Sequence, residues 1–225
     1  GIGKADNTGD SIYNGALDNA SGTAGLLALA KAFASKADKP ARTVVFLAVT
    51  AEEQGLWGSA WYATNPVFPL EKTLANINMD GLNWFGKTKD IVVVGMGQYS
   101  LGDYLKEEAG KAGRYISPEP SPEAGYYFRS DHFNFAKAGI PALYTDNGID
   151  HTEKGKDFGR QKNREYVDNY YHKPSDEYDP SMWNLEGAVE DLKLLFGVGK
   201  RVANQKEWPG WKDNSEFKGI RRTVR

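Results

Sequence analysis

The sequence contains no cysteine and only three histidines among its 225 residues. The absence of cysteine excludes disulfide bonds, thiolate metal sites and cysteine nucleophiles. It does not select a compartment, because proteins without disulfides occur both in the cytosol and in bacterial envelopes. Any metal-dependent chemistry of this chain must therefore use carboxylate oxygens and imidazole nitrogens.

Long apolar runs and an excess of one charge are also lacking. No apolar segment approaches the roughly 18 residues of a membrane-spanning helix. The formal net charge is only −2, from 28 basic and 30 acidic residues. A nearly neutral chain offers no broad positive field to a nucleic acid backbone. We therefore expect neither a membrane nor a nucleic acid as a partner.

Length and composition predict one domain over residues 1–225. A chain of this length with 40% hydrophobic residues can enclose one sizeable core. Residues 206–225 are polar and lack periodicity, which predicts a surface tail. Residues 1–19 are rich in glycine and asparagine, a composition typical of a loop inside a domain. We therefore expect N-terminal strands of the domain to be missing, and the absence of a signal peptide carries no weight.

The order of periodic segments predicts an α/β protein. Helical spacing of apolar residues predicts helices over 21–37, 58–63, 101–112, 131–138 and 181–205. Short apolar or β-branched runs predict strands over 42–49, 73–79, 90–94 and 141–145. Alternation of the two kinds of element favours an α/β architecture. Residues 148–164 are rich in charge and glycine, and we expect a mobile loop there.

Acidic residues follow two of the predicted strands. Glu52 and Glu53 come directly after the strand over 42–49, and Asp80 follows the strand over 73–79. Each has an ordinary alternative, a solvated glutamate or a turn aspartate. Open α/β sheets, however, bind ligands at the carboxyl ends of their strands. One glutamate of the pair could bind a metal while its neighbour acts as a base.

Four segments carry a family resemblance in their order along the chain: GALDNASGTAGLLALAKAF, VVFLAVTAEEQGLWGSAWYA, ANINMDG and YYHKPSDEYD. They resemble the blocks of zinc-dependent aminopeptidases typified by secreted bacterial leucyl aminopeptidases. The resemblance implies a three-layer α/β fold with a predominantly parallel mixed sheet flanked by helices. It also implies a peptide substrate and a periplasmic or extracellular location.

The resemblance implies a metal site with two zinc ions. Asp18 would bridge both ions, Asp80 would complete the first, and Glu53 with His172 would complete the second. The residue types agree with this implication, because aspartate, glutamate and histidine are all zinc ligands. Asp18 alone could equally be a helix cap, since it precedes a predicted helix.

The resemblance also implies catalytic roles. Glu52 would be the general base, and Tyr171 would hydrogen-bond the developing oxyanion, with Tyr170 as the alternative if the register differs by one. A half-buried aromatic residue beside a functional loop is the other explanation for Tyr171. We expect His132 to be a structural or pocket-edge residue, and His151 to face solvent or the rim of the site.

One ligand of the implied site is missing. The family's first zinc ligand is a histidine in an upstream His-x-Asp segment, and no histidine precedes Asp18 here. The set of Asp18, Glu53 and His172 could still hold one zinc with an open fourth position, whereas Asp80 lacks a nitrogen partner. We therefore expect one zinc or none in this chain. Missing strands would also expose an apolar sheet edge, which a dimer contact or an N-terminal fragment could cover.

The leading functional hypothesis is a metal-dependent exopeptidase that removes N-terminal residues from peptides, with impaired activity in this chain. Trp84, Phe85 and Tyr127 are candidates for an apolar substrate pocket. A glutaminyl cyclase-like acyltransferase with one zinc is a first alternative. A catalytically silent binding domain of the same fold is a second alternative.

Overall fold

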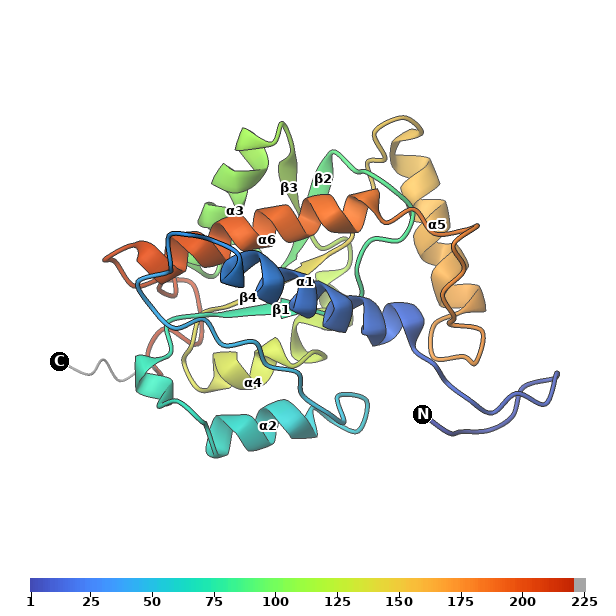
Figure 1. The fold of residues 1–225 in the computed structure, drawn as a ribbon, viewed down its shortest axis with the longest axis horizontal. Helices are drawn as coiled ribbons and strands as arrows, with labels where there is room; N and C mark the ends of the chain where they lie inside the picture. The colour runs from blue at the N-terminus through green and yellow to red at the C-terminus, as the bar shows by residue number, and fades with distance from the viewer. Residues whose placement is uncertain (221–225) are drawn as a thin grey trace.

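A four-stranded mixed sheet lies at the centre of the structure, a computed structural model that describes residues 1–220 (Figure 1). The strand order is β1-β4-β2-β3. The strands are β1 (Asn76–Met79), β4 (Ala142–Asp146), β2 (Asp90–Val94) and β3 (Tyr115–Pro118). The pairs β1–β4 and β2–β3 are parallel, and β2–β4 is antiparallel. Two parallel pairs out of three confirm a predominantly parallel mixed sheet.

Strand β2 has the most buried sequence of the sheet. All five of its residues are buried, and its apolar run DIVVV is typical of a strand covered on both faces. Ile91 and Val93 belong to the main core cluster, together with Leu143 of β4. The core therefore lies on the central strands, and both edges of the sheet are less enclosed.

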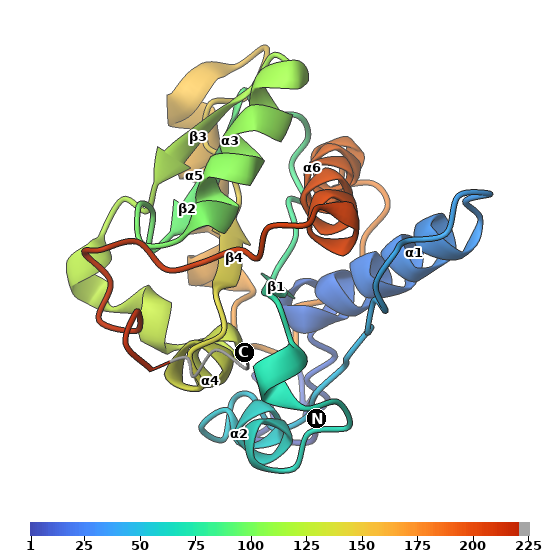
Figure 2. The ribbon, with the colours of Figure 1, turned by 90° about the vertical axis from the view of Figure 1, so that its left-hand side faces the viewer.

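Helices cover both faces of this sheet, as Figures 1 and 2 show. One face carries α1 (Gly22–Ala34), α3 (Ser100–Lys111) and α6 (Glu186–Asn204). The opposite face carries α2 (Trp57–Thr64) and α4 (His132–Lys137). This arrangement confirms the predicted α/β class and the flanking helices. No helix among residues 1–220 is both long and apolar enough to cross a membrane.

Helix α6 shows why the sequence predicted it so clearly. Leu194, Leu195, Val198 and Val202 are buried at three- and four-residue steps, so one apolar stripe faces the core. Gly187 near its start approaches the backbone so closely that an added Cβ would lie 2.2 Å from the Gly86 carbonyl oxygen. The helix is thus fixed along its length.

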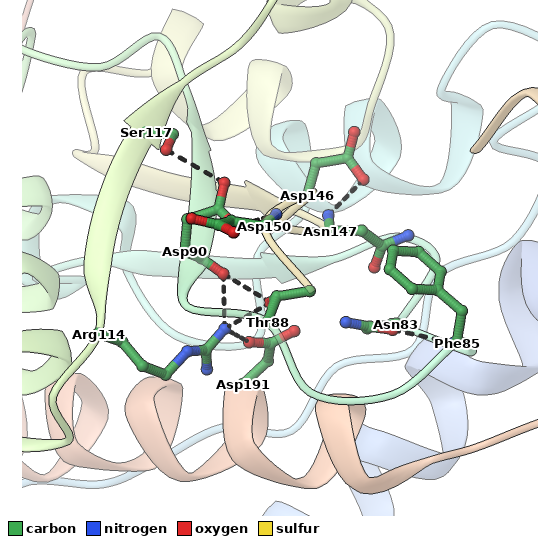
Figure 3. Close-up of polar contacts among 10 residues, drawn as sticks. All are labelled: Asn83, Phe85, Thr88, Asp90, Arg114, Ser117, Asp146, Asn147, Asp150 and Asp191. Carbon is green, nitrogen blue, oxygen red and sulfur yellow. Dashed lines mark hydrogen bonds and ion pairs between the residues drawn. The ribbon is translucent and has the colours of Figure 1, made fainter. Parts of the chain in front are cut away.

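A buried ion pair joins α6 to the sheet (Figure 3). The Arg114 guanidinium lies 2.7 Å from a carboxylate oxygen of Asp191, and both side chains are almost fully buried. Beside this pair, the Asp90 carboxylate accepts hydrogen bonds from the Asp150 amide (2.8 Å) and the Ser117 hydroxyl (3.2 Å). These contacts tie the loop after β4 to the edge of the sheet.

The prediction of a strand over 42–49 is wrong. These residues form neither helix nor strand, and their only backbone amide bond among the described residues runs from Arg42 to the Ala203 carbonyl (3.1 Å). Val45 is 46% exposed. Between this segment and β1 lies a groove of about 760 Å³, whose other walls come from α1 and α6. The β-branched composition favours an extended chain, but pairing requires a neighbouring strand that the described residues do not supply.

The mobile loop predicted over 148–164 is also wrong over most of its length. Helix α5 (Gly155–Asn169) begins within it, and strand β3 was not predicted at all. Only Gly159 of α5 is fully buried, so its sequence shows no apolar stripe. Local ion pairs support the helix instead, from Asp157 to Arg160 (2.9 Å) and from Lys162 to Glu165 (2.8 Å).

The prediction of a surface tail over 206–225 is wrong for residues 206–220. Trp211 and Phe217 are buried in the main core cluster. The Trp211 indole N–H donates to the Gly139 carbonyl at 2.9 Å. These aromatic residues lie on irregular backbone. Their burial therefore has no periodic sequence pattern from which it could be predicted. Residues 221–225 lie outside the described part of the chain.

Candidate metal centre

Three predicted ligands from distant parts of the chain meet in the structure. Ligand atoms of Asp18, Glu53 and His172 all lie within 4.8 Å of one another. His172 Nε2 is 3.1 Å from Asp18 Oδ2 and 2.8 Å from Glu53 Oε1. Asp18 precedes α1, Glu53 precedes α2 and His172 follows α5, so the fold, and not local sequence, brings them together.

Asp80 lies at the end of β1, beside this group but not within it. Its Oδ2 accepts a hydrogen bond from the Ser130 hydroxyl at 2.6 Å, and that hydroxyl in turn accepts one from the Asn78 amide at 2.8 Å. The carboxylate is largely buried, and burial raises its pKa. Asp80 is nevertheless close enough to Asp18 for its charge to raise the pKa of that residue.

Asn19 fixes the loop that carries Asp18 to the strand that carries Asp80. Its side-chain amide donates to the Met79 carbonyl at 3.0 Å, and its side-chain oxygen accepts from the Gly81 amide at 3.1 Å. Both partners flank Asp80 in the sequence. The relative position of the two aspartates is therefore set by one neutral side chain between them.

Left-handed backbone at non-glycine residues is concentrated around the site. Within residues 1–220, only Ala51 (φ 56°), Leu56 (φ 61°) and His172 (φ 55°) have this conformation. Two of them flank the glutamate pair, and the third is a predicted ligand. Such residues are strained, and strain of this kind gathers at functional sites.

Asp18 and Glu52 have raised pKa values, so they hold their protons more tightly than usual. Burial and the charges of Asp80 and Glu53 raise the pKa of Asp18 to about 6. Burial and the same two charges raise the pKa of Glu52 to about 8. A bound divalent cation would offset this repulsion. Oxygen and imidazole donors with an open fourth position fit zinc, so the residues present suit the metal that the sequence implied.

Tyr171 stacks directly on the predicted histidine ligand. The ring centroids of Tyr171 and His172 are 3.7 Å apart, and the Tyr171 side chain is partly exposed. Burial, followed by the charges of Asp18 and Glu53, raises the pKa of Tyr171 to about 12. Tyr170, the alternative, packs instead against the edge of Trp84, with ring centroids 6.4 Å apart.

The other two histidines are structural. His132 is completely buried between the rings of Tyr127 and Tyr144, each 4.8 Å away, and burial lowers its pKa to about 3. This agrees with the structural role expected for it. The expectation that His151 faces solvent or the rim is wrong. His151 is buried, and its Nδ1 accepts the amide protons of Glu153 and Lys154 just before α5.

The three pocket candidates are buried. Phe85 packs against Phe158, and Tyr127 belongs to the main core cluster. Trp84 lines a cavity of about 430 Å³ that also borders Leu17 and Tyr170, the neighbours of Asp18 and Tyr171. Sequence reasoning overlooked Ser130 and Asn19, although Asn19 lies inside the LDNASG block. Small polar loop residues are common, so their type alone is a weak signal.

An open α/β sheet with carboxylates and a histidine gathered beside strand ends has the architecture of a metal-dependent hydrolase. The model of peptidase family M28 matches residues 3–196. The chain therefore belongs to this family of metal-dependent peptidases, and the resemblance to zinc aminopeptidases is confirmed.

Solved structures of aminopeptidases share the fold. A zinc aminopeptidase from Bacillus subtilis is 24% identical with a TM-score of 0.64, over 86% of this chain and 43% of that chain. The LapA aminopeptidase of Legionella pneumophila is 20% identical with a TM-score of 0.64, over 88% and 48%. A probable zinc metalloprotease of Pyricularia oryzae is 55% identical over 49 residues, which are 22% of this chain and 9% of that protein. The chain thus spans less than half the length of these relatives.

The raised pKa values predict how pH affects the metal-free protein. The folded pKa of Glu52 exceeds its ordinary value of 4.5, so the native state binds its proton more tightly than the unfolded state does. Stability contributed by this residue must then fall as pH rises from about 4.5 to about 8. We expect the melting temperature of the E52Q variant to exceed that of wild type by roughly 2–4 °C at pH 8, and by less at pH 5, both in EDTA. A difference independent of pH would contradict the proton-binding argument.

Proposed function

We propose that this chain is the catalytic part of an exopeptidase that removes N-terminal residues from peptides. The observation that carries the proposal is the meeting of Asp18, Glu53 and His172 beside Glu52. Membership of peptidase family M28 supports a peptide substrate. The structural relatives named above are aminopeptidases, which favours the N-terminus of the peptide as the site of attack.

Asp18, Glu53 and His172 would hold one zinc ion. Three protein ligands with a free fourth position are typical of catalytic zinc sites. Bound zinc would lower the pKa of a water molecule toward 7 and would polarise the scissile carbonyl. Asp80 and Asp18 together offer only oxygen, so a second ion would be held weakly.

Glu52 would serve as the general base. It is adjacent to a proposed ligand, and its pKa is raised by burial and by the surrounding carboxylates. A bound cation would offset that repulsion and favour the ionised form that a base requires. Glu52 would then take the proton of the attacking water and pass it to the leaving amine.

Tyr171 would stabilise the oxyanion that develops on the scissile carbonyl. Its hydroxyl is protonated at neutral pH, so the group can donate a hydrogen bond. Stacking on His172 holds the ring beside the proposed metal ligand.

Replacement of Glu52 tests the proposed mechanism. We expect E52Q to lower the hydrolysis of leucyl 4-nitroanilide by about 10²–10⁴-fold while zinc binding is retained, because only the base is lost. The exposed Glu123 supplies the matched control, and E123Q should keep wild-type activity. Wild-type hydrolysis by E52Q would refute the assignment.

The ion count tests the proposed ligand set. We expect one zinc per chain by metal analysis after dialysis, and none in H172A, because that variant loses the only nitrogen ligand. Two tightly held zinc ions in the wild-type chain would show that Asp80 belongs to a complete second site.

A glutaminyl cyclase-like acyltransferase is a second candidate, since the structure groups three ligands and leaves Asp80 outside. Cyclisation of N-terminal glutamine without release of leucine from the anilide would favour this candidate. A chain that binds no zinc and has neither activity would instead be a silent binding domain.

A second polypeptide strand would cover the groove between residues 42–49 and β1. One wall is strand β1, and apolar side chains such as Leu47 and Ile77 line the groove. In solutions of this chain alone, a second copy is the available source. We expect a light-scattering mass of twice 24.9 kDa. The mass of one chain would exclude a dimer and leave a separate segment as the covering strand.

A further inference from the structure

We infer that Asp176 is a positioning residue that sets the place of Asp18 relative to His172. The inference rests on the proposed metal site. Asp176 is only 3% exposed, although it lies in a polar turn four residues after His172. A carboxylate so deeply buried needs partners, because burial of an unpaired charge is costly. Its partners identify its role.

Those partners are the backbone amides of the loop that carries Asp18. Asp176 Oδ1 accepts from the Leu17 amide at 3.0 Å, and Oδ2 accepts from the Asp18 amide at 3.1 Å. The backbone carbonyl of Asp176 also accepts from the Ala16 amide at 3.1 Å. Hydrogen bonds from N–H groups to a carboxylate are shorter and stronger than neutral ones. Three successive amides of one loop therefore depend on a single residue.

The Tyr166 hydroxyl completes the arrangement by donating to Asp176 Oδ2 at 3.3 Å. Tyr166 lies on α5, the helix that leads into the turn carrying His172. Asp176 thus joins two segments that are more than 150 residues apart in the sequence, each of which carries a proposed ligand. The 3.1 Å separation of Asp18 Oδ2 and His172 Nε2 depends on this connection.

Asp176 is not one of the proposed zinc ligands, but its hydrogen bonds set the position of one of them. Zinc requires its ligand atoms at defined distances, so a loop that drifts by a few tenths of an ångström weakens binding. Residues that orient ligands typically contribute about 10–100-fold to metal affinity. On this basis the side chain of Asp176 supports zinc binding through Asp18 without touching the ion.

The test compares D176N with a matched buried aspartate. D176N keeps the side-chain shape but turns one acceptor oxygen into a donor that faces backbone amides. D191N removes the charge of an equally buried residue, which pairs with Arg114 on the other side of the core. In competition with a chromophoric chelator, we expect zinc affinity to fall about 10–100-fold in D176N and to stay within twofold in D191N. Both variants should lower the melting temperature of the metal-free chain.

Amide hydrogen exchange of the metal-free chain supplies a second readout. We expect the Leu17 and Asp18 amides to exchange at least about tenfold faster in D176N than in wild type, because one acceptor oxygen is left for two amides and the new NH2 group faces backbone N–H groups. In D191N these two amides should change no more than the amides of β2. If wild type binds no zinc, the proposed function fails, and the exchange result alone decides the role of Asp176.

Two results would overturn the inference. One is unchanged exchange at Leu17 and Asp18 in D176N, and the other is an equal loss of zinc affinity in D176N and D191N, which would reduce the effect to general destabilisation. Should D176N fail to fold, Y166F replaces it, since it removes only the hydroxyl that orients Asp176. We expect Y166F to weaken zinc binding roughly threefold, and unchanged affinity would then refute the inference.

Discussion

Repulsion among carboxylates beside the sheet is the constraint on which the rest of the structure depends. Burial, together with the nearby charges of Asp80 and Glu53, raises the pKa values of Asp18 and Glu52 well above the ordinary range. A protein would not retain such crowding for stability alone, because each added charge opposes folding. Neighbouring polar groups hold the loops in place, and a bound cation would offset the remaining repulsion.

The polar side chains that fix the loops around the site are either uncharged or form hydrogen bonds with backbone groups. Asn19 binds the peptide groups on either side of Asp80, and Ser130 donates to the Asp80 carboxylate itself. Asp176 binds the amides of Leu17 and Asp18. None of these contacts uses a lysine or arginine next to the ligand atoms. The positive charge that the site needs is thus left for a metal to supply.

The sequence and the structure agree best where a residue pattern has a local cause. Strand β2 and helix α6 were predictable because burial on both faces gives a continuous apolar run, and burial on one face gives a helical stripe. The proposed ligands were predictable because a family resemblance links Asp18 and Glu53 to His172, although the structure shows no strand before either acid. The role of Asp176 could not be predicted from the sequence, because its partners are backbone amides, and no pattern of side chains indicates them.

The failures of prediction share a different cause, which is dependence on distant partners. Residues 42–49 have the composition of a buried strand, yet no strand among the described residues pairs with them. Trp211 and Phe217 show the opposite error. Their segment is polar and irregular, which predicts a surface position, yet both side chains are buried in the core. Composition indicates what a segment can do, whereas the neighbours it meets decide what it does.

The unpaired segment and the metal centre are physically connected. Residues 42–49 lead directly into Glu52 and Glu53, and β1 leads directly into Asp80. The groove between these two walls therefore lies between the segment that leads to Glu52 and Glu53 and the strand that leads to Asp80. Any polypeptide strand that pairs with both walls would fix their spacing at the 4.7–4.9 Å per strand of a regular sheet. Closure of the groove and the geometry of the carboxylates would then be one event, because the same backbone sets both.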